Sequence, residues 1–212
     1  MANSKNVEGM ARYGISTKGT LGISIYELRK IAARIGKDHK LALKLWESGI
    51  HEARILASYI DDPEKVTEKQ MEEWVSDFES WDVCDQVCWL FENTPFAYKK
   101  VKEWSKRKEE FVKRTAFSLI AGLSVHDKKA KDSTFIKLFP IIKRAAKDER
   151  NYVRKAVNWS LRNIGKRNQA LNRAAIKLAN EIKNIDSKSA RWIAADALRE
   201  LKGQKVQKRL RK

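Results

Sequence analysis

The amino-acid sequence predicts an all-α protein, because three features agree. Helix-forming residues dominate, and the 212 residues include only three prolines and nine glycines. Apolar residues recur almost throughout at the spacing of one helix face. No segment shows the sustained two-residue alternation of a half-buried strand, so we expect no sheet.

The helices of the first half are delimited by recognisable cap residues. Gly36 and Gly49 are expected to end two helices, because glycine readily adopts the conformation that follows a last turn. Asp62-Pro63 has the composition of an N-cap followed by an N1 proline, and Thr67 opens a capping box. The expected helices are 25–35, 41–48, 51–60, one after Asp62, one after Thr67 and 81–93, the last capped by Ser80.

The second half continues the pattern with longer helices. A helix is expected to start at Thr94-Pro95, followed by helices at 109–125, 134–147, 150–166, 169–183 and 187–202. Helices of this length with short links favour antiparallel pairs, which recur at roughly 36 to 40 residues, near the period of HEAT repeats. We therefore predict one HEAT-like repeat domain over residues 1–203, a right-handed solenoid with a concave face. A compact helical bundle is the alternative, and the basic tail, residues 204–212, is expected to be frayed.

Positive charge is concentrated in the second half of the chain. The formal net charge is +18, with 14 Lys and Arg against 16 Asp and Glu in residues 1–100 and 31 against 11 in residues 101–212. This asymmetry favours a polyanionic partner, either nucleic acid or an anionic membrane surface, over an ordinary solvated surface. No apolar run approaches the roughly 20 residues of a membrane span. The polar N-terminus lacks a signal peptide, so a cytoplasmic location is expected.

The cysteines and histidines do not form a recognisable metal site. Cys84 and Cys88 are four residues apart, but a zinc site needs two more ligands, and His39, His51 and His126 are scattered. We expect the two thiols to pack as small hydrophobic groups and expect no metal. The glycine-rich phosphate loops and the nucleophile elbow of serine hydrolases are also absent from the sequence.

A tryptophan lies within a basic stripe of the helix expected at 150–166. The apolar face of this helix includes Val157, and Trp159 lies about 160° around the helix from it. Either a neighbouring helix packs on this indole or the indole faces a ligand. The stripe consists of Lys155, Trp159, Arg162 and Lys166.

A second tryptophan lies next to a carboxylate on the helix expected at 81–93. Trp81 and Asp85 are four residues apart, so the indole and the carboxylate are neighbours on one face. A carboxylate facing phosphates would oppose DNA binding, so Asp85 either has a chemical purpose or is an ordinary surface acid paired with a lysine. Asp82 is explained as a first-turn acid. Arg114 has small residues along its stripe, which leaves room for a phosphate, although a structural salt bridge explains it equally well.

These segments together resemble the AlkD-like DNA alkylation-repair glycosylases, which are built of HEAT-like repeats. The resemblance covers most of the chain and includes MARYG, LWESGIHEARILA, SWDVCDQVC, FVKRTAFSL and YVRKAVNWSLRNIGKRN. The last three contain the functional pattern of the family in the same order. The chain departs from longer members before the Gly14–Gly22 loop, where we expect part of a first helix pair to be missing.

The resemblance implies a monofunctional alkylpurine DNA glycosylase that acts on duplex DNA without flipping the base. Such an enzyme hydrolyses the N-glycosidic bond of cationic purines, 3-methyladenine and 7-methylguanine, and leaves an abasic site. It implies catalytic roles for Asp85, Trp81 and Trp159 and DNA-binding roles for Arg114, Arg162, Lys155 and Lys166 on a concave basic face. It also implies a monomer without metal or cofactor, associated with the nucleoid. The alternatives are a non-catalytic nucleic-acid-binding module and a protein-interaction scaffold.

Overall fold

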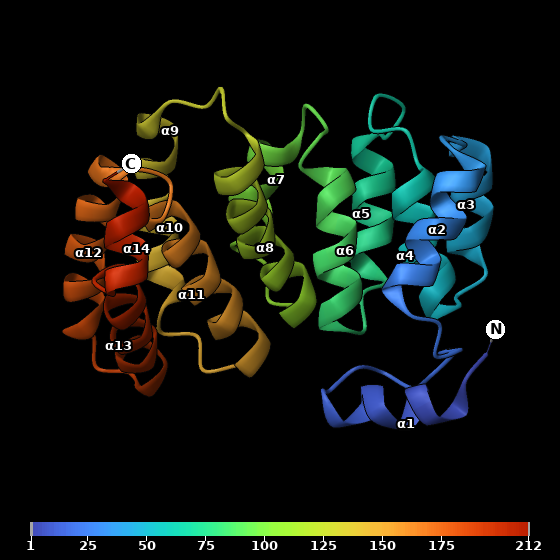
Figure 1. Ribbon diagram of the computed structural model, residues 1–212, viewed down its shortest axis with the longest axis horizontal. Coiled ribbons are helices and arrows are strands. Elements are labelled where there is room, and N and C mark those ends of the chain that lie inside the picture. Colours follow the sequence, from blue (N-terminus) through green and yellow to red (C-terminus); the bar gives the residue numbers. More distant parts are fainter. Residues whose placement is uncertain (1, 212) are drawn as a thin grey trace. The chain divides into compact units, whose positions relative to one another are not determined.

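The computed structural model describes residues 2–211, which form helices and connecting segments without any strand (Figure 1). The all-α prediction is therefore confirmed for this part of the chain. The described residues divide into two compact units, unit 1 up to residue 98 and unit 2 from residue 99. The single repeat domain expected for residues 1–203 stays a prediction.

The described residues of unit 1 form six complete helices, several of which have side-chain N-caps. The helices are α1 (Ser4–Arg12), α2 (Ile25–Ile35), α3 (His39–Glu47), α4 (His51–Ile60), α5 (Glu68–Ser76) and α6 (Trp81–Phe91). Thr67 caps α5 as the sequence predicts, and Ser24 and Asp38 cap α2 and α3 in the same way; each accepts a hydrogen bond from the backbone N–H three residues further on.

The core of unit 1 is built around α4 and a pair of stacked indoles. Helix α4 packs against α2, α3 and α6. Trp46 and Trp74 stack with ring centroids 4.0 Å apart, and Phe78 and Phe91 pack beside them. These residues are buried, so the apolar stripes of α3 and α5 meet in the core.

The N-terminal segment is fastened to the start of α4. The buried carboxylate of Glu52 accepts hydrogen bonds from the backbone N–H groups of Leu21 at 2.8 Å, Gly22 at 2.7 Å and Ile23 at 3.3 Å. Gly22 has φ of 74°, and a Cβ there would lie 2.2 Å from the Asn3 carbonyl oxygen. Glycine is therefore required where this loop crosses the N-terminal segment. Helix α1 itself was not predicted.

The long helices of unit 2 pack on one another. Helix α11 packs against α8 and α13, and α12 pairs with α13. A Cβ on Gly165 would lie within 3 Å of Leu201 and Ala175, so the end of α11 approaches α12 and α13 closely. The helices are α7 (Ala97–Trp104), which crosses the boundary between the units, α8 (Glu110–His126), α9 (Asp132–Ile136), α10 (Phe139–Ala145), α11 (Asn151–Gly165), α12 (Gln169–Lys183), α13 (Lys188–Leu201) and α14 (Gln204–Leu210).

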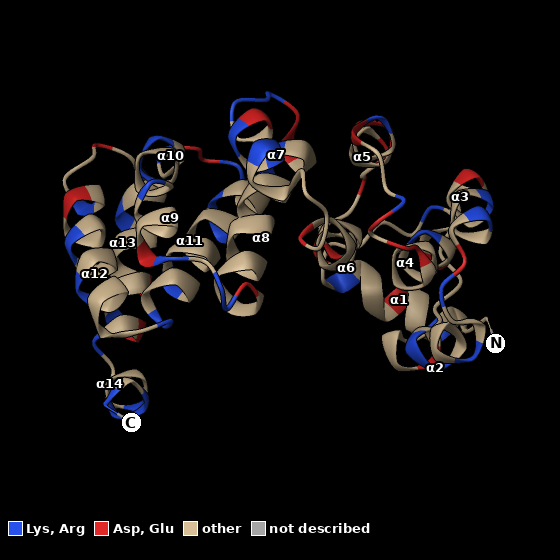
Figure 2. Ribbon diagram, turned by 90° about the horizontal axis from the view of Figure 1, so that it is seen from above, with Lys and Arg blue, Asp and Glu red and all other residues tan. Residues whose placement is uncertain are grey.

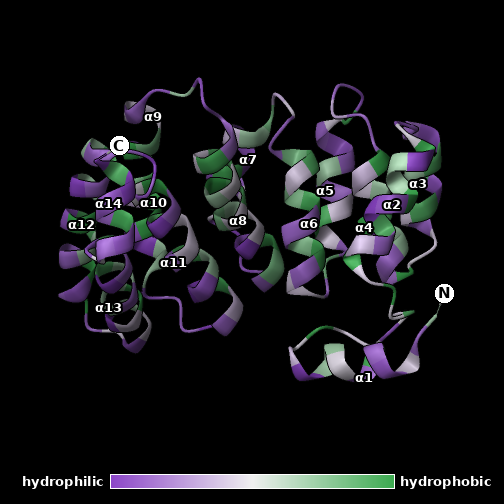
Figure 3. Cartoon of the chain, viewed as in Figure 1, coloured by the Kyte–Doolittle hydropathy of each residue, from purple (hydrophilic) through white to green (hydrophobic). Residues whose placement is uncertain are grey.

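Hydrophobic and charged residues are distributed unevenly over the helices of unit 2 (Figure 2 and Figure 3). Helices α11, α12 and α13 each carry hydrophobic and hydrophilic residues (Figure 3), as amphipathic helices do. Lys and Arg are frequent on α10, α12 and α14 of unit 2 (Figure 2). Among the described residues, no helix has the length and apolar character to cross a membrane.

Three expectations about local structure were wrong. Asp62-Pro63 begins a short turn instead of a helix, since the Asp62 carboxylate caps the N–H of Glu64. The helix expected at 134–147 is divided into α9 and α10, because Pro140 has no N–H and fits only the first turn of a helix.

The basic tail at 204–212, of which residues up to 211 are described, was expected to be frayed. Residues Gln204–Leu210 instead form α14. Val206 is buried there, and the Gln207 amide donates to the Leu201 carbonyl at 2.6 Å and to Asn172 at 3.1 Å. The apolar contact and these hydrogen bonds, with those of Arg209 to the Lys166 carbonyl and of Gln169 to the Leu210 carbonyl, hold the short helix in place.

Candidate functional site

Trp81 and Asp85 lie on one face of α6, as the sequence predicts. Both are half-buried and stand four residues apart near the start of the helix. The indole Nε1 of Trp81 donates to the Tyr13 carbonyl oxygen at 3.0 Å. The end of α1 therefore fixes the orientation of this ring, a contact that helix periodicity could not reveal.

Asp82, the residue after Trp81, has a different role from the one expected. It is buried, and its carboxylate contacts His51 Nε2 at 2.8 Å and accepts the hydroxyl of Ser80. Burial alone would raise the pKa of Asp82, but the hydrogen bonds from His51 and Ser80 hold this pKa below its ordinary value. The first-turn acid is thus a buried link between α4 and α6. Ser80 occupies the N-cap position without capping the helix through its side chain, since its hydroxyl serves Asp82.

Asp85 lines a pocket of about 470 Å³ within unit 1. The Arg29 guanidinium lies 5.9 Å from the centroid of the Tyr59 ring, and the Tyr59 hydroxyl donates to Gln86. Burial raises the pKa of Tyr59, so this hydroxyl stays protonated and remains a donor. The full lining is Arg29, Ala32, Tyr59, Asp85, Gln86 and Trp89.

Trp89 forms the open side of this pocket and is 56% exposed. Sequence reasoning left this residue undecided and did not single out Arg29 or Gln86. The available signal was weak. Gln86 and Trp89 follow Asp85 in the same motif, but the pocket also needs Tyr59, 27 residues before Gln86, and Arg29, 60 residues before Trp89. The pocket combines a carboxylate, a guanidinium and aromatic walls, which suits a flat cationic or polar group.

Arg114 is buried where α8 meets α11 in unit 2. It is 5% exposed, and its Nη1 donates to the Tyr152 carbonyl oxygen at 2.8 Å near the start of α11. The arginine therefore helps to position α11, the helix that carries Trp159.

The basic stripe of α11 is partly paired with acids of α13. Lys155 is exposed and Trp159 is half-buried. Arg162 lies 2.5 Å from Glu200 and 3.2 Å from Asp196, while Lys166 Nζ lies 2.7 Å from Glu200. Burial alone would raise the pKa of Glu200, but Lys166 and Arg162 hold it below its ordinary value. Two of the three cations of this stripe, Arg162 and Lys166, thus share the Glu200 carboxylate in this structure.

The two cysteines are buried within unit 1. Cys84 and Cys88 are buried and not disulfide-bonded, as expected. The described residues contain no group of three or more His, Cys, Asp and Glu side chains arranged to hold a metal ion.

Comparison with solved structures defines the class of the fold. A structure described as "a new family of proteins related to the HEAT-like repeat DNA glycosylases with affinity for branched DNA structures" is 17% identical, covers 92% of this chain and 88% of that chain, and has a TM-score of 0.77. A designed armadillo repeat protein is 16% identical over 82% of this chain and 91% of that chain, with a TM-score of 0.36. The first comparison confirms the predicted HEAT-like repeat fold.

The family follows from the sequence itself. The profile described as "DNA alkylation repair enzyme" matches residues 1–201. This chain belongs to that family. No curated protein matches it.

Proposed function

We propose that this protein hydrolyses the N-glycosidic bond of cationic alkylated purines, 3-methyladenine and 7-methylguanine, in duplex DNA. Alkylation at N3 or N7 gives the base a positive charge and makes it a good leaving group. The enzyme then needs to stabilise a deoxyribose that becomes oxocarbenium-like as the bond breaks. No base flipping, metal or cofactor is required, and the product is an abasic site.

Asp85 is the group that we assign to this stabilisation. Its carboxylate offers negative charge to the developing oxocarbenium ion and can orient the attacking water. Trp81 stands beside it on α6 and presents an indole, whose face attracts positive charge. The single observation that carries the proposal is this pair on one face of α6, with Asp85 opening onto a pocket, in a chain of the DNA alkylation repair family.

The residues of unit 2 are assigned to the DNA backbone and the sugar. Trp159 is proposed to flank the deoxyribose, while Lys155, Arg162 and Lys166 hold phosphates on either side of it, on a concave basic face. Arg114, which is buried, is proposed to serve DNA binding by positioning α11, the helix that carries Trp159. Phosphate contact by Arg162 and Lys166 requires competition with Glu200. Such a competition is feasible, because partly exposed ion pairs contribute only about 0.2–1 kcal/mol each. We further propose that the protein acts as a monomer on nucleoid DNA in the cytoplasm.

The proposal is tested by treating duplex DNA with a methylating agent, incubating it with the protein and quantifying free bases by chromatography. The expected result is release of 3-methyladenine and 7-methylguanine, with strands that stay intact until alkali cleaves them at abasic sites. Strand cleavage without alkali would contradict a monofunctional glycosylase. Absence of both free bases, with DNA binding intact, would contradict the reaction altogether.

A second candidate is DNA binding without base release. It is favoured by the solved protein of the same fold that is described as having affinity for branched DNA structures. This candidate predicts tighter binding to a four-way junction than to a duplex of equal length, and no free base from methylated DNA. Equal affinity for both DNAs together with base release would exclude it.

A further inference from the structure

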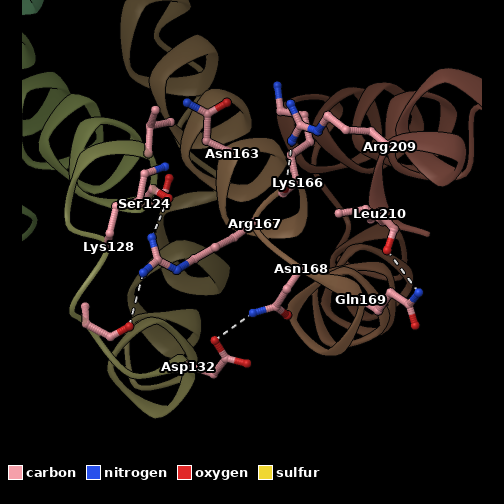
Figure 4. A pocket seen from close by; sticks show the side chains of 12 residues that line it. Ser124, Lys128, Asp132, Asn163, Lys166, Arg167, Asn168, Gln169, Arg209 and Leu210 are labelled. Carbon is pink, nitrogen blue, oxygen red and sulfur yellow. Dashed lines mark hydrogen bonds between the residues drawn. The ribbon is translucent and has the colours of Figure 1, made fainter. Parts of the chain in front are cut away.

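Unit 2 contains a second pocket, of about 970 Å³, at the C-terminal end of α11 (Figure 4). Its walls come from the end of α8 with the loop that follows, from the turn between α11 and α12, and from α14. The basic residues Lys128, Lys166, Arg167 and Arg209 line it, against the single acid Asp132. The composition is thus that of an anion site.

The wall of this pocket is held in place by Arg167. Its guanidinium donates to the carbonyl oxygens of Ser124 at 3.0 Å and Ala130 at 3.1 Å (Figure 4). The guanidinium donates to the Asp127 carbonyl oxygen at 2.6 Å as well. It also lies 4.7 Å from the centroid of the Phe135 ring. Arg167 therefore fixes the loop that carries Lys128.

The acid of the pocket is already engaged, whereas two cations are exposed. The Asp132 carboxylate accepts the Asn168 amide at 2.8 Å (Figure 4). Lys128 and Arg209 are exposed, and Arg209 donates to the Lys166 carbonyl oxygen. An anion entering the pocket would meet positive charge from two separate elements, the loop after α8 and α14.

The position of the pocket relative to Trp159 indicates which anion it fits. Lys166 lines the pocket and also belongs to the basic stripe that contains Trp159. It lies seven residues after Trp159 in the chain. Seven residues of α-helix span about 10 Å, and a DNA strand advances about 3.4 Å per nucleotide. A strand that follows α11 therefore places a phosphate at the pocket about three nucleotides from the nucleotide at Trp159.

We propose that this pocket binds a backbone phosphate of DNA about three nucleotides from the lesion, through Lys128, Lys166 and Arg209. The inference rests on the proposed function, since it assumes that the nucleotide at Trp159 is the alkylated one. It goes beyond that function by naming a site that fixes the register of the DNA.

The first test compares Lys128→Ala and Arg209→Ala with two matched controls. Lys129 is exposed on the same loop and Lys205 is exposed on α14, but neither lines the pocket. The pocket variants are expected to weaken binding to a lesion-containing duplex and to lower the slope of log affinity against log salt by about one each. Lys129→Ala and Lys205→Ala should have smaller effects. Equal losses in all four variants would overturn the inference, because they would indicate diffuse charge attraction.

The second test locates the phosphate. Neutral methylphosphonates are placed one at a time along a duplex that contains one 7-methylguanine. The expected result is one position, two to four nucleotides from the lesion, where the substitution weakens binding of the wild type but not of the Lys128→Ala/Arg209→Ala variant. A scan without such a position would overturn the inference while leaving base release by the wild type, and hence the proposed function, intact. Failure of the wild type to bind DNA would overturn both.

Discussion

Glu200 controls the charge of the basic stripe, because its carboxylate engages both Arg162 and Lys166. Sequence periodicity places these two cations on one face of α11 but cannot show that α13 brings an acid to them. Under the proposed function, phosphates and Glu200 compete for the same two groups. The pairs are only partly buried, so their contribution to stability is about 0.2–1 kcal/mol each.

We predict that Glu200→Gln tightens DNA binding. Removal of this carboxylate releases Lys166 and leaves Arg162 paired with Asp196 alone, so affinity should rise several-fold at low salt and its salt dependence should steepen. Fluorescence anisotropy with a labelled duplex measures both quantities. Glu181→Gln is the matched control, since Glu181 pairs with Lys143 on other helices of unit 2. An equal gain in the control would show that only net charge matters.

Glu92, at the end of α6, gives a pH-dependent contribution to stability. Burial raises its pKa from 4.5 to about 8, so the neutral acid is favoured in the folded state. The stabilisation present below pH 4.5 is therefore lost as the pH rises through about 8. Glu92→Gln should gain stability relative to the wild type between pH 5 and pH 9. Urea unfolding at several pH values measures the difference, and a constant difference would contradict the assignment.

At the scale of elements, the N-terminal segment acts as a support for α6. Glu52 anchors the loop at Leu21–Ile23, and Tyr13, just after α1, holds the Trp81 indole. A buried carboxylate that accepts several backbone N–H groups forms strong, charge-assisted hydrogen bonds. The segment is thus coupled to the candidate site through two contacts.

Glu52→Gln is expected to loosen this segment. Replacing the charged acceptor should destabilise unit 1 by about 1.5–3 kcal/mol and increase amide exchange over residues 4–23. Base release should fall more than DNA affinity, because Trp81 loses its support while the cations of unit 2 are untouched. Glu47→Gln, at an exposed position on α3, serves as the control. Unchanged exchange at Leu21–Ile23 would contradict the anchoring role.

The sequence predicted most helices because their caps and stripes are local. Glycines after α2 and α3, the Thr67 cap and the apolar stripe of α12 all act within a few residues. Helix α1 was not predicted, because its apolar positions are only Val7, Met10 and Ala11 and none of its residues is buried in a core. Helix α14 was not predicted because its docking rests on Val206 and Gln207, single residues whose partners lie on other helices.

The candidate site could be predicted only in part for the same reason. Spacing within one helix placed Trp81 beside Asp85 and put Trp159 in the basic stripe. Contacts across the chain could not be read from spacing: His51 with Asp82, Tyr13 with Trp81, and Glu200 with Arg162. Residue types at helical intervals show which side chains share a helix face. The groups that orient Trp81 or pair with Arg162 lie on segments distant in the sequence, so spacing does not show them.

At the scale of the whole molecule, charge and chemistry are divided between the two units. Unit 1 has 12 Lys and Arg against 16 Asp and Glu, a net charge of −4, and unit 2 has 33 against 11, a net charge of +22. Unit 2 therefore supplies the attraction for phosphates, while the acidic unit 1 carries the carboxylate proposed to act on the sugar. This division explains how an acid can serve a DNA-binding protein without opposing binding.

The central claim is tested most directly by the single-turnover rate of base release from a duplex with one 7-methylguanine. Wild type, Asp85→Asn and the exposed-acid control Glu73→Gln are compared at saturating protein, with dissociation constants measured separately. We predict a rate about 10²- to 10³-fold lower for Asp85→Asn, an unchanged dissociation constant, and wild-type behaviour for Glu73→Gln. Release at the wild-type rate by Asp85→Asn would contradict the account.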